Sequence, residues 1–154
     1  MATFFLDSSA IAKRYVTEVG TGWTIALTDP GSYNVCWLAA VTRVEVITAL
    51  YRRHRMGHIG VADTQRAAAA FLHEVAVAFR VLTLDSAMLD AAARLIGVHP
   101  ILAYDAIQLA TALRLGSEYD SARLPPPVFV CADQTLNHAA AAEGLMVENP
   151  TAHP

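Results

Sequence analysis

The chain opens with the run Thr3-Phe4-Phe5-Leu6-Asp7-Ser8-Ser9, in which an apolar stretch ends abruptly in residues that favour helix N-caps. A short, continuous apolar run bounded in this way is typical of a strand buried on both faces. Ile11, Tyr15 and Val16 then follow at helical spacing. The stretch therefore predicts a buried strand that passes directly into a helix over residues 10–18.

The same alternation of strand and helix continues along the rest of the chain. Apolar runs predict further strands at residues 34–39, 81–84, 128–131 and 145–147. Helical spacing predicts helices at residues 23–27, 42–56, 60–79, 85–96, 104–115 and 134–143. This order indicates an α/β/α sandwich, with helices on both faces of a mainly parallel sheet of about four to five strands.

Local signals set the expected ends of several elements. Thr42 and Glu45 match a capping box at the start of their helix, and Gly97 is expected to close the helix over residues 85–96. The sequence contains no internal repeat and no long linker. We therefore expect one domain over residues 1–148, followed by a frayed tail at residues 149–154.

The composition fits a domain with a large core. Of the 154 residues, 55% are hydrophobic and 16% are charged, which excludes a mainly disordered chain. No apolar run reaches the ~18–20 residues of a membrane span, and no secretory signal is recognisable. Cys36 and Cys131 stand singly in apolar runs, so we expect reduced thiols in a cytoplasmic protein rather than a disulfide framework or a zinc site.

The sequence has few basic residues, and several of them lie close together in the chain. A net charge of −3 gives no overall basic field of the kind that marks many nucleic-acid-binding proteins. Lys13 is the only lysine. Three arginines, Arg52, Arg53 and Arg55, crowd the end of one predicted helix, where they either contact phosphates or complement the helix C-terminus. Arg14, near the first strand, is a further phosphate-binding candidate.

Four acidic residues stand at predicted strand-to-helix or loop-to-helix junctions: Asp7, Glu45, Asp105 and Asp133. Each one alone is explained by the preference of acids for helix N-termini. Their apolar neighbours distinguish them, because buried charges are costly unless they are paired or bind a cation. Ligands outside an open parallel sheet lie at the carboxyl ends of its strands, where these acids are expected to meet. Clustered hard oxygen ligands favour Mg²⁺ or Mn²⁺, ions that serve phosphoryl chemistry.

Four segments together resemble a known family. Phe5-Leu6-Asp7-Ser8-Ser9-Ala10-Ile11-Ala12-Lys13-Arg14-Tyr15 is similar to the opening motif of PIN-domain ribonucleases, and in particular of the VapC-like toxins of type II toxin–antitoxin systems. Thr42-Arg43-Val44-Glu45-Val46 resembles their second motif. Tyr104-Asp105-Ala106-Ile107-Gln108-Leu109-Ala110-Thr111-Ala112 resembles the third, and Cys131-Ala132-Asp133-Gln134-Thr135-Leu136 the fourth. The motifs occur in the family's order over nearly the whole chain.

The resemblance implies a PIN-like fold and a Mg²⁺- or Mn²⁺-dependent endoribonuclease that hydrolyses RNA phosphodiester bonds and inhibits translation as a toxin. It implies Asp7, Glu45, Asp105 and Asp133 as the catalytic acids and metal ligands, with Asp7 and Asp105 favoured for the main ion. It also implies a homodimer and a cognate VapB-like antitoxin. Three residues are expected to support the site: Ser8, Ser9 and Asn137.

Other classes of protein fit the sequence less well. A phospho-accepting receiver domain typically needs a lysine late in the chain, and a haloacid-dehalogenase-like phosphatase needs a DxD motif where this chain has Asp7-Ser8-Ser9. Dinucleotide binding lacks its G-x-G-x-x-G motif. Two alternatives stay open: a PIN-like module that binds RNA or protein without cutting, and an RNA-processing nuclease outside any toxin–antitoxin pair.

Overall fold

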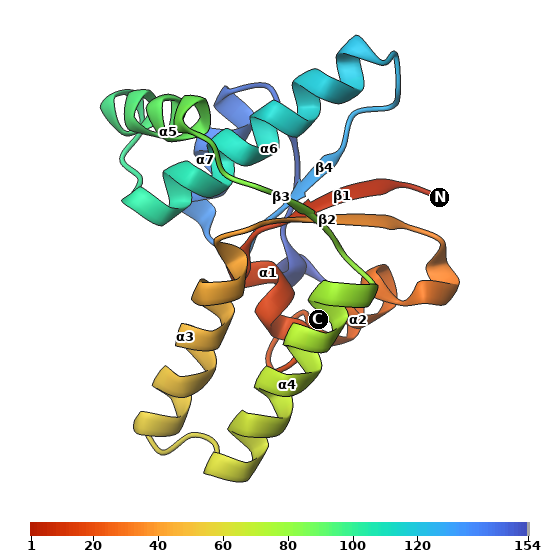
Figure 1. Ribbon diagram of the computed structural model, residues 1–154, viewed down its shortest axis with the longest axis vertical. Helices are drawn as coiled ribbons and strands as arrows, with labels where there is room; N and C mark the ends of the chain where they lie inside the picture. The colour runs from red at the N-terminus through yellow and green to blue at the C-terminus, as the bar shows by residue number, and fades with distance from the viewer. Residues whose placement is uncertain (154) are drawn as a thin grey trace.

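The computed structural model describes residues 1–153 and has a five-stranded sheet at its centre (Figure 1). The strands are β1 (Thr3–Leu6), β2 (Val35–Ala39), β3 (Arg80–Leu82), β4 (Val128–Val130) and β5 (Met146–Glu148). They lie in the order β3-β2-β1-β4-β5, and every pair is parallel. Phe5 of β1 is in register with Trp37 of β2 and Phe129 of β4. The predicted parallel α/β/α architecture is confirmed.

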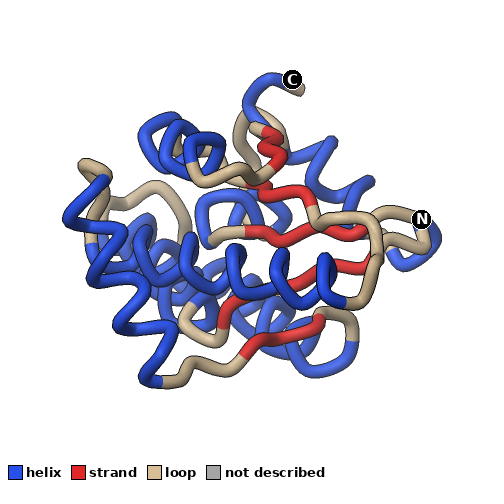
Figure 2. The backbone as a smooth tube through the Cα atoms, turned by 90° about the horizontal axis from the view of Figure 1, so that it is seen from above, coloured by secondary structure: helices blue, strands red, loops and turns tan. Residues whose placement is uncertain are grey.

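Helices cover both faces of the sheet, as the two views show (Figures 1 and 2). One layer contains α1 (Ser8–Ile11), α2 (Thr21–Thr28), α3 (Thr42–Arg55) and α4 (Val61–Val77). The other contains α5 (Ser86–Val98), α6 (Ala103–Ser121) and α7 (Gln134–Ala142). Short 3₁₀ turns follow α1 at Ala12–Arg14, precede β2 at Pro30–Ser32 and follow β5 at Pro150–Ala152. The paired helices α3 and α4 project from the sheet as a hairpin.

The central strands supply side chains to two separate cores. In β1, Phe5 packs into the core beneath α5–α7, whereas Leu6 packs into the core beneath α1–α4. In β4, Phe129 and Val130 divide in the same way. The Phe5 and Phe129 rings stack with centroids 5.9 Å apart. The high apolar content of the sequence therefore fills two cores, because successive strand residues point to opposite faces.

Helix ends differ from several predictions. The helix expected to reach residue 18 is instead α1 and a 3₁₀ turn that ends at Arg14, where the Thr21 hydroxyl lies within 3.1 Å of the Lys13 and Val16 carbonyl oxygens. Helix α6 continues to Ser121 rather than residue 115. Gly97 does not end α5, which runs one residue further to Val98. Pro100 accounts for that end, because a proline disfavours helical geometry in the residue before it.

The C-terminal segment is packed rather than frayed. Pro150 is buried, and its carbonyl oxygen lies so close to Gly20 that a Cβ at that position would come within 2.4 Å of it. Gly20 also has φ of +89°, a conformation that glycine adopts without strain. The rings of His153 and Trp23 stack with centroids 4.6 Å apart. The expectation of a frayed end is wrong for residues 149–153, and Pro154 lies outside the described residues.

No single helix within residues 1–153 is both long and apolar enough to cross a membrane, and the apolar pair α5 and α6 is bent by 117° between its members.

Candidate active site at the carboxyl edge of the sheet

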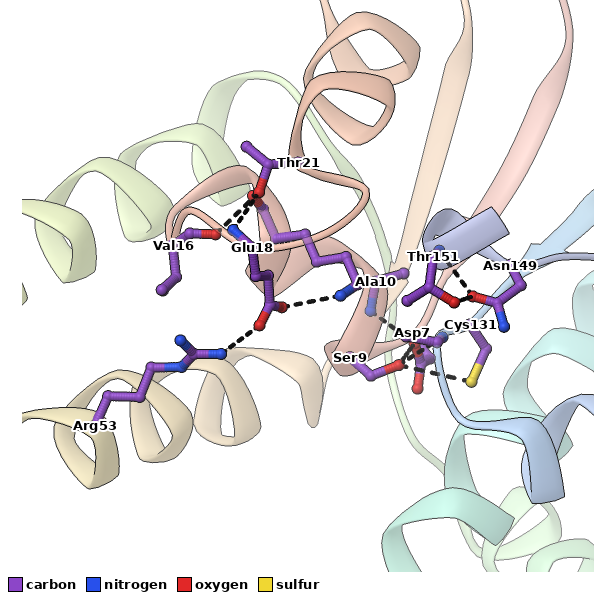
Figure 3. A network of polar contacts seen from close by, with 12 residues as sticks. Asp7, Ser9, Ala10, Val16, Glu18, Thr21, Arg53, Cys131, Asn149 and Thr151 are labelled. Atoms are coloured by element: carbon purple, nitrogen blue, oxygen red, sulfur yellow. Dashed lines mark hydrogen bonds and ion pairs between the residues drawn. The ribbon is translucent and has the colours of Figure 1, made fainter. Parts of the chain in front are cut away.

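Asp7 lies directly after β1 and is the N-cap of α1, as predicted. Its Oδ1 atom accepts hydrogen bonds from the Ser9 hydroxyl at 2.7 Å and from the Ala10 backbone N–H at 3.0 Å. Asp7 as a residue is only 3% exposed. Figure 3 shows Asp7, Ser9 and Cys131 grouped at this end of the strand. The first acidic residue is therefore fixed by its own helix N-terminus.

Ser9 also connects Asp7 to the loop after β4. Its Oγ accepts a hydrogen bond from the Ala132 backbone N–H at 2.9 Å and lies 3.6 Å from the Cys131 sulfur. That sulfur accepts the Asp133 backbone N–H at 3.2 Å. Burial, and then the negative charge of Asp7, raise the pKa of the Cys131 thiol. Cys131 is therefore a neutral spacer inside the site, a role that its apolar sequence context did not indicate.

Glu45, in the first turn of α3, receives hydrogen bonds from two other elements. The Ser8 hydroxyl donates to Oε2 at 3.0 Å, and the Gln108 amide donates to Oε1 at 2.7 Å. Gln108 also donates to the Thr42 hydroxyl at 2.8 Å. The predicted capping box is wrong, because Val41 is the N-cap and Thr42 lies buried inside the helix. Glu45 is thus held by side chains of α1 and α6 rather than by its own helix terminus.

Asp105 and Asp133 complete the acidic set at two further helix starts. Asp105 lies in the first turn of α6, where its Oδ2 atom accepts the Leu102 backbone N–H at 3.3 Å. Asp133 is the N-cap of α7, and its Oδ1 atom accepts the Leu136 backbone N–H at 2.8 Å. Asp133 is exposed, whereas Asp105 is half-buried. Each hydrogen bond uses one carboxylate oxygen and leaves the other available.

The electrostatics of the acidic residues indicate a missing positive charge. Burial raises the pKa of Asp7 to about 6. Burial also raises the pKa of Glu45, and the charge of Asp105 adds to that effect. The pKa of Asp105 is raised by burial and by the charge of Asp133. Among residues 1–153, none of the four acids forms an ion pair.

Nearby cations are engaged elsewhere. Arg14 donates to Glu74 at 2.8 and 3.0 Å, so the structure does not support its assignment as a phosphate contact. Glu18 binds both Lys13 and Arg53 (Figure 3 shows Arg53 beside Glu18). These ion pairs neutralise other acids, and none of them includes an acid of the edge.

The remaining arginines of the predicted basic run face different hollows. Arg52 and Arg53 line a hollow of about 650 Å³ that also contains Ser8 and Glu45. Arg55 lines a separate hollow on α3 with none of the four acids in its wall. Of the predicted phosphate contacts, only Arg52 and Arg53 therefore stand beside the acidic edge.

Two amides support this edge from inside the fold. Asn137, expected to support the site, is buried and donates from Nδ2 to the Cys131 carbonyl oxygen at 2.8 Å. Gln108, which sequence reasoning missed, is 1% exposed and links Glu45 to Thr42. Its signal in the sequence was a polar residue one helical turn after Asp105, between Ile107 and Leu109. A polar residue in so apolar a turn needs a buried partner.

The carboxylate oxygens of the four acids are the type of ligand that suits a hard divalent cation. Carboxylate oxygens are the ligands that Mg²⁺ and Mn²⁺ prefer, and the raised pKa values mark acids that a positive charge would stabilise in ionised form. The geometry is looser than a finished cage: no group of at least three His, Cys, Asp or Glu side chains in the described part of the chain is close enough to hold an ion. An ion held by three or more of these carboxylates would require them to move closer together.

Comparison with known proteins gives a family and several similar folds. The family model described as PIN domain matches residues 4–141, and no curated protein matches the chain. Three solved structures are similar. PAE2754 from Pyrobaculum aerophilum is 19% identical, with a TM-score of 0.61, over 95% of this chain and 83% of that one. VapC20 from Mycobacterium tuberculosis, described as a sarcin–ricin loop cleaving toxin, is 17% identical, with a TM-score of 0.62, over 98% of this chain and 99% of that one. VapBC2 from Rickettsia felis, bound to a DNA fragment from its promoter, is 10% identical, with a TM-score of 0.62, over 96% of this chain and 98% of that one.

Proposed function

Since the chain belongs to the PIN domain family of nucleases, we propose that it is a divalent-metal-dependent endoribonuclease and the toxin of a toxin–antitoxin pair. The observation that carries the nuclease proposal is the acidic edge itself. Four carboxylates from four helix starts lie at one end of the sheet, and none of them has a cationic partner within residues 1–153. The other partly buried acids, Glu18 and Glu74, are both paired with cations, so the unpaired set at the edge is suited to bind an ion.

In this proposal the four acids are the metal ligands, and neighbouring side chains orient them. Asp7 and Asp105 are the favoured ligands, with Glu45 and Asp133 completing the set. Bound Mg²⁺ or Mn²⁺ would supply activation of a water and neutralisation of charge on the scissile phosphate. The protein's own part is orientation: Ser9 fixes Asp7, and Ser8 and Gln108 fix Glu45. Carboxylates already held in place lose less entropy when they bind an ion.

The toxin proposal is supported by likeness to structures of the same fold. VapC20 is described as a toxin that cleaves the sarcin–ricin loop, and VapBC2 was solved as a complex on DNA. By analogy, we propose that this chain cleaves RNA in the cytoplasm and thereby inhibits translation. We also propose that it forms a homodimer and is bound by a VapB-like antitoxin. The analogy is one of fold, and function has to be tested on the site.

The nuclease proposal is tested by RNA cleavage with Mg²⁺ or Mn²⁺ and with excess chelator. Asp105→Asn should abolish cleavage because it removes a charged ligand. Asp120→Asn makes the same chemical change at an exposed position of the same helix and should cut like the parent. Equal loss in both variants, or cleavage that persists in chelator, would contradict the proposal.

The toxin proposal needs a separate measurement. Expression of the parent chain in a bacterial host should arrest growth, and Asp105→Asn should not. Co-expression of the cognate antitoxin should restore growth. A chain that cuts RNA in vitro but leaves growth unchanged would instead favour an RNA-processing nuclease.

A further inference from the structure

We propose that Glu18 is a positioning residue for the acidic edge. It forms ion pairs with Lys13, directly after α1, and with Arg53 of α3. This bridge fixes the spacing between α1, which Asp7 caps, and α3, which carries Glu45. The inference rests on the proposed function, because it gives a residue outside the acidic set a part in holding that set ready for a divalent cation.

The bridge and the acidic edge share a hollow between α1 and α3. Its volume is about 350 Å³, and residues of both groups line it: Ser8, Ser9, Lys13, Glu18, Glu45 and Arg53. Figure 3 shows the pair of Glu18 and Arg53 in one view with Asp7. Glu45 and Arg53 are eight residues apart on α3, a rise of about 12 Å. The Ser8–Glu45 hydrogen bond and the Glu18 bridge therefore tie α1 to α3 at two separate points.

These two links are the polar ties between the helices. No other side-chain hydrogen bond or ion pair among residues 1–153 joins α1 or its 3₁₀ turn to α3, directly or through one residue. Their remaining contact is apolar, in the core that contains Ala10, Ile11, Val46 and Leu50. Apolar packing is non-directional, whereas an ion pair with hydrogen bonds has a preferred geometry. The bridge therefore limits how far the one-turn helix α1 can shift along α3.

Such a shift matters for a metal ligand set. Mg²⁺ accepts oxygen ligands only at about 2.0–2.1 Å and in near-ideal octahedral geometry. A site of this kind requires its ligands to be held within about 0.5 Å of the productive position. Because Asp7 and Glu45 come from the two bridged helices, loss of the bridge should weaken ion binding.

Glu18 is held firmly enough to act in this way. The Thr21 hydroxyl accepts its backbone N–H at 3.0 Å, and the neighbouring Gly20 packs against the buried Pro150. Burial opposes ionisation of the Glu18 carboxyl group, but hydrogen bonds and charge from Lys13 and Arg53 lower its pKa below the usual value. The carboxylate is therefore ionised at neutral pH and fixed between its two cations.

Glu74 provides a matched comparison. Its side chain is 26% exposed, against 29% for Glu18, and it binds Arg14, the residue after Lys13. Glu74 lies on α4, however, and α4 carries none of the four acids. Loss of either glutamate charge breaks a partly buried ion pair beside α1, but only loss of the Glu18 charge releases α3.

The test measures the dissociation constant of Mn²⁺ for the full chain without RNA, by electron paramagnetic resonance of the free ion. Asp105→Asn should abolish binding, which assigns the bound ion to the acidic edge. Glu18→Gln should weaken binding about 10-fold, as is typical when a residue that orients a metal ligand is lost. Glu74→Gln should leave the affinity unchanged.

Variants of Arg53 separate position from charge. Arg53→Met removes a positive charge, so a purely long-range electrostatic effect would strengthen Mn²⁺ binding. Loss of the bridge predicts the opposite, a weakening of about 10-fold. Arg53→Lys keeps the charge and should recover most of the parental affinity. Glu18→Gln combined with Arg53→Met should bind no more weakly than the weaker single variant, because both changes break the same bridge.

A stability measurement excludes a general effect on folding. Urea unfolding of Glu18→Gln and Glu74→Gln should show similar losses of stability, since each variant loses one partly buried acid from an ion pair. A difference in Mn²⁺ affinity between two equally stable variants then reports the position of the carboxylates.

The outcomes distinguish this inference from the proposed function. Unchanged affinity in Glu18→Gln, equal losses in Glu18→Gln and Glu74→Gln, or tighter binding by Arg53→Met would overturn the inference and leave the metal site intact. A parent chain that binds no Mn²⁺ would overturn the proposed function and the inference together. A parent that shows the expected pattern but never cuts RNA would confirm the bridge and contradict the nuclease proposal.

Discussion

Two groups of acidic side chains in this molecule differ in whether they form ion pairs. Glu18 and Glu74 are matched with Lys13, Arg53 and Arg14. The acids of the sheet edge, Asp7 foremost, have no such partners. Asp7 and Glu45 contact the same segment, residues 7 to 18, that carries Lys13 and Arg14. This difference is the basis of the proposal that the edge binds a cation.

The pKa shifts express the same contrast. Arg14 donates to Glu74 and lowers the pKa of that carboxyl group. Burial alone would raise the pKa of Glu18, but hydrogen bonds and charge from Lys13 and Arg53 outweigh it, and the net shift of that pKa is downward. Asp7 has no cation, and burial raises its pKa to about 6. A paired acid stabilises the fold when ionised, whereas an unpaired buried acid costs stability when ionised.

The largest expected effect is on cleavage. Asp7→Asn should slow metal-dependent RNA cleavage about 10³-fold, the loss of several kcal/mol of transition-state stabilisation. Asn keeps the N-cap and the hydrogen bond from Ser9, so the fold should persist. Glu74→Gln, the matched change in the paired group, should leave the rate within a few-fold. Cleavage rates at saturating Mn²⁺ decide this, and similar losses in both variants would erase the contrast.

The second effect is on stability. In chelator at pH 7.5, Asp7→Asn should raise the free energy of unfolding by up to about 3 kcal/mol, because it removes a buried charge whose pKa is raised from 3.8 to about 6. A raised folded-state pKa means that the stability of the parent is greatest below 3.8 and is lost as pH rises through about 6. The difference between parent and variant should therefore vanish near pH 4. Urea unfolding across this range would measure it, and a constant difference would show that charge is not the cause.

The paired group should respond to pH with the opposite sign. Arg14→Met should lower the free energy of unfolding by about 2 kcal/mol at pH 7.5, because it leaves Glu74 half-buried without its cation. A lowered folded-state pKa means that this stabilisation is present above the usual value near 4.5 and is lost as pH falls through the lowered one. The cost of Arg14→Met should shrink in acid. A cost that grew in acid would contradict the ion-pair assignment.

The smallest expected effect is on how Glu45 is held. Ser8→Ala removes one of its two side-chain donors and should reduce cleavage a few-fold, while changing stability by about 1 kcal/mol or less. Ser32→Ala is a control hydroxyl deletion away from the edge, where the side chain contacts only nearby backbone. It should not change the cleavage rate. Equal rates for Ser8→Ala and the parent would limit the orienting role to Gln108.

Local sequence patterns predicted those features that depend on neighbouring residues. The apolar run before Asp7 became β1, and Asp7, Asp85 and Asp133 are N-caps. The Thr42–Glu45 capping box failed because both side chains bind Gln108, which lies 63 residues beyond Glu45. A capping box is a local preference of modest energy, and a buried amide that needs partners can override it.

The sequence by itself determined the alternation of strands and helices, and with it four acids at the starts of helices, because apolar periodicity and N-cap preference act over a few residues. Only the tertiary structure decided which charges are neutralised. The pairing of Arg14 with Glu74 spans 60 residues. Which arginines of α3 line the hollow beside Glu45 likewise depends on how that helix packs, since Arg52 lines it and Arg55 does not. Coulombic and hydrogen-bond energies depend on distance in space, which the order of residues does not give.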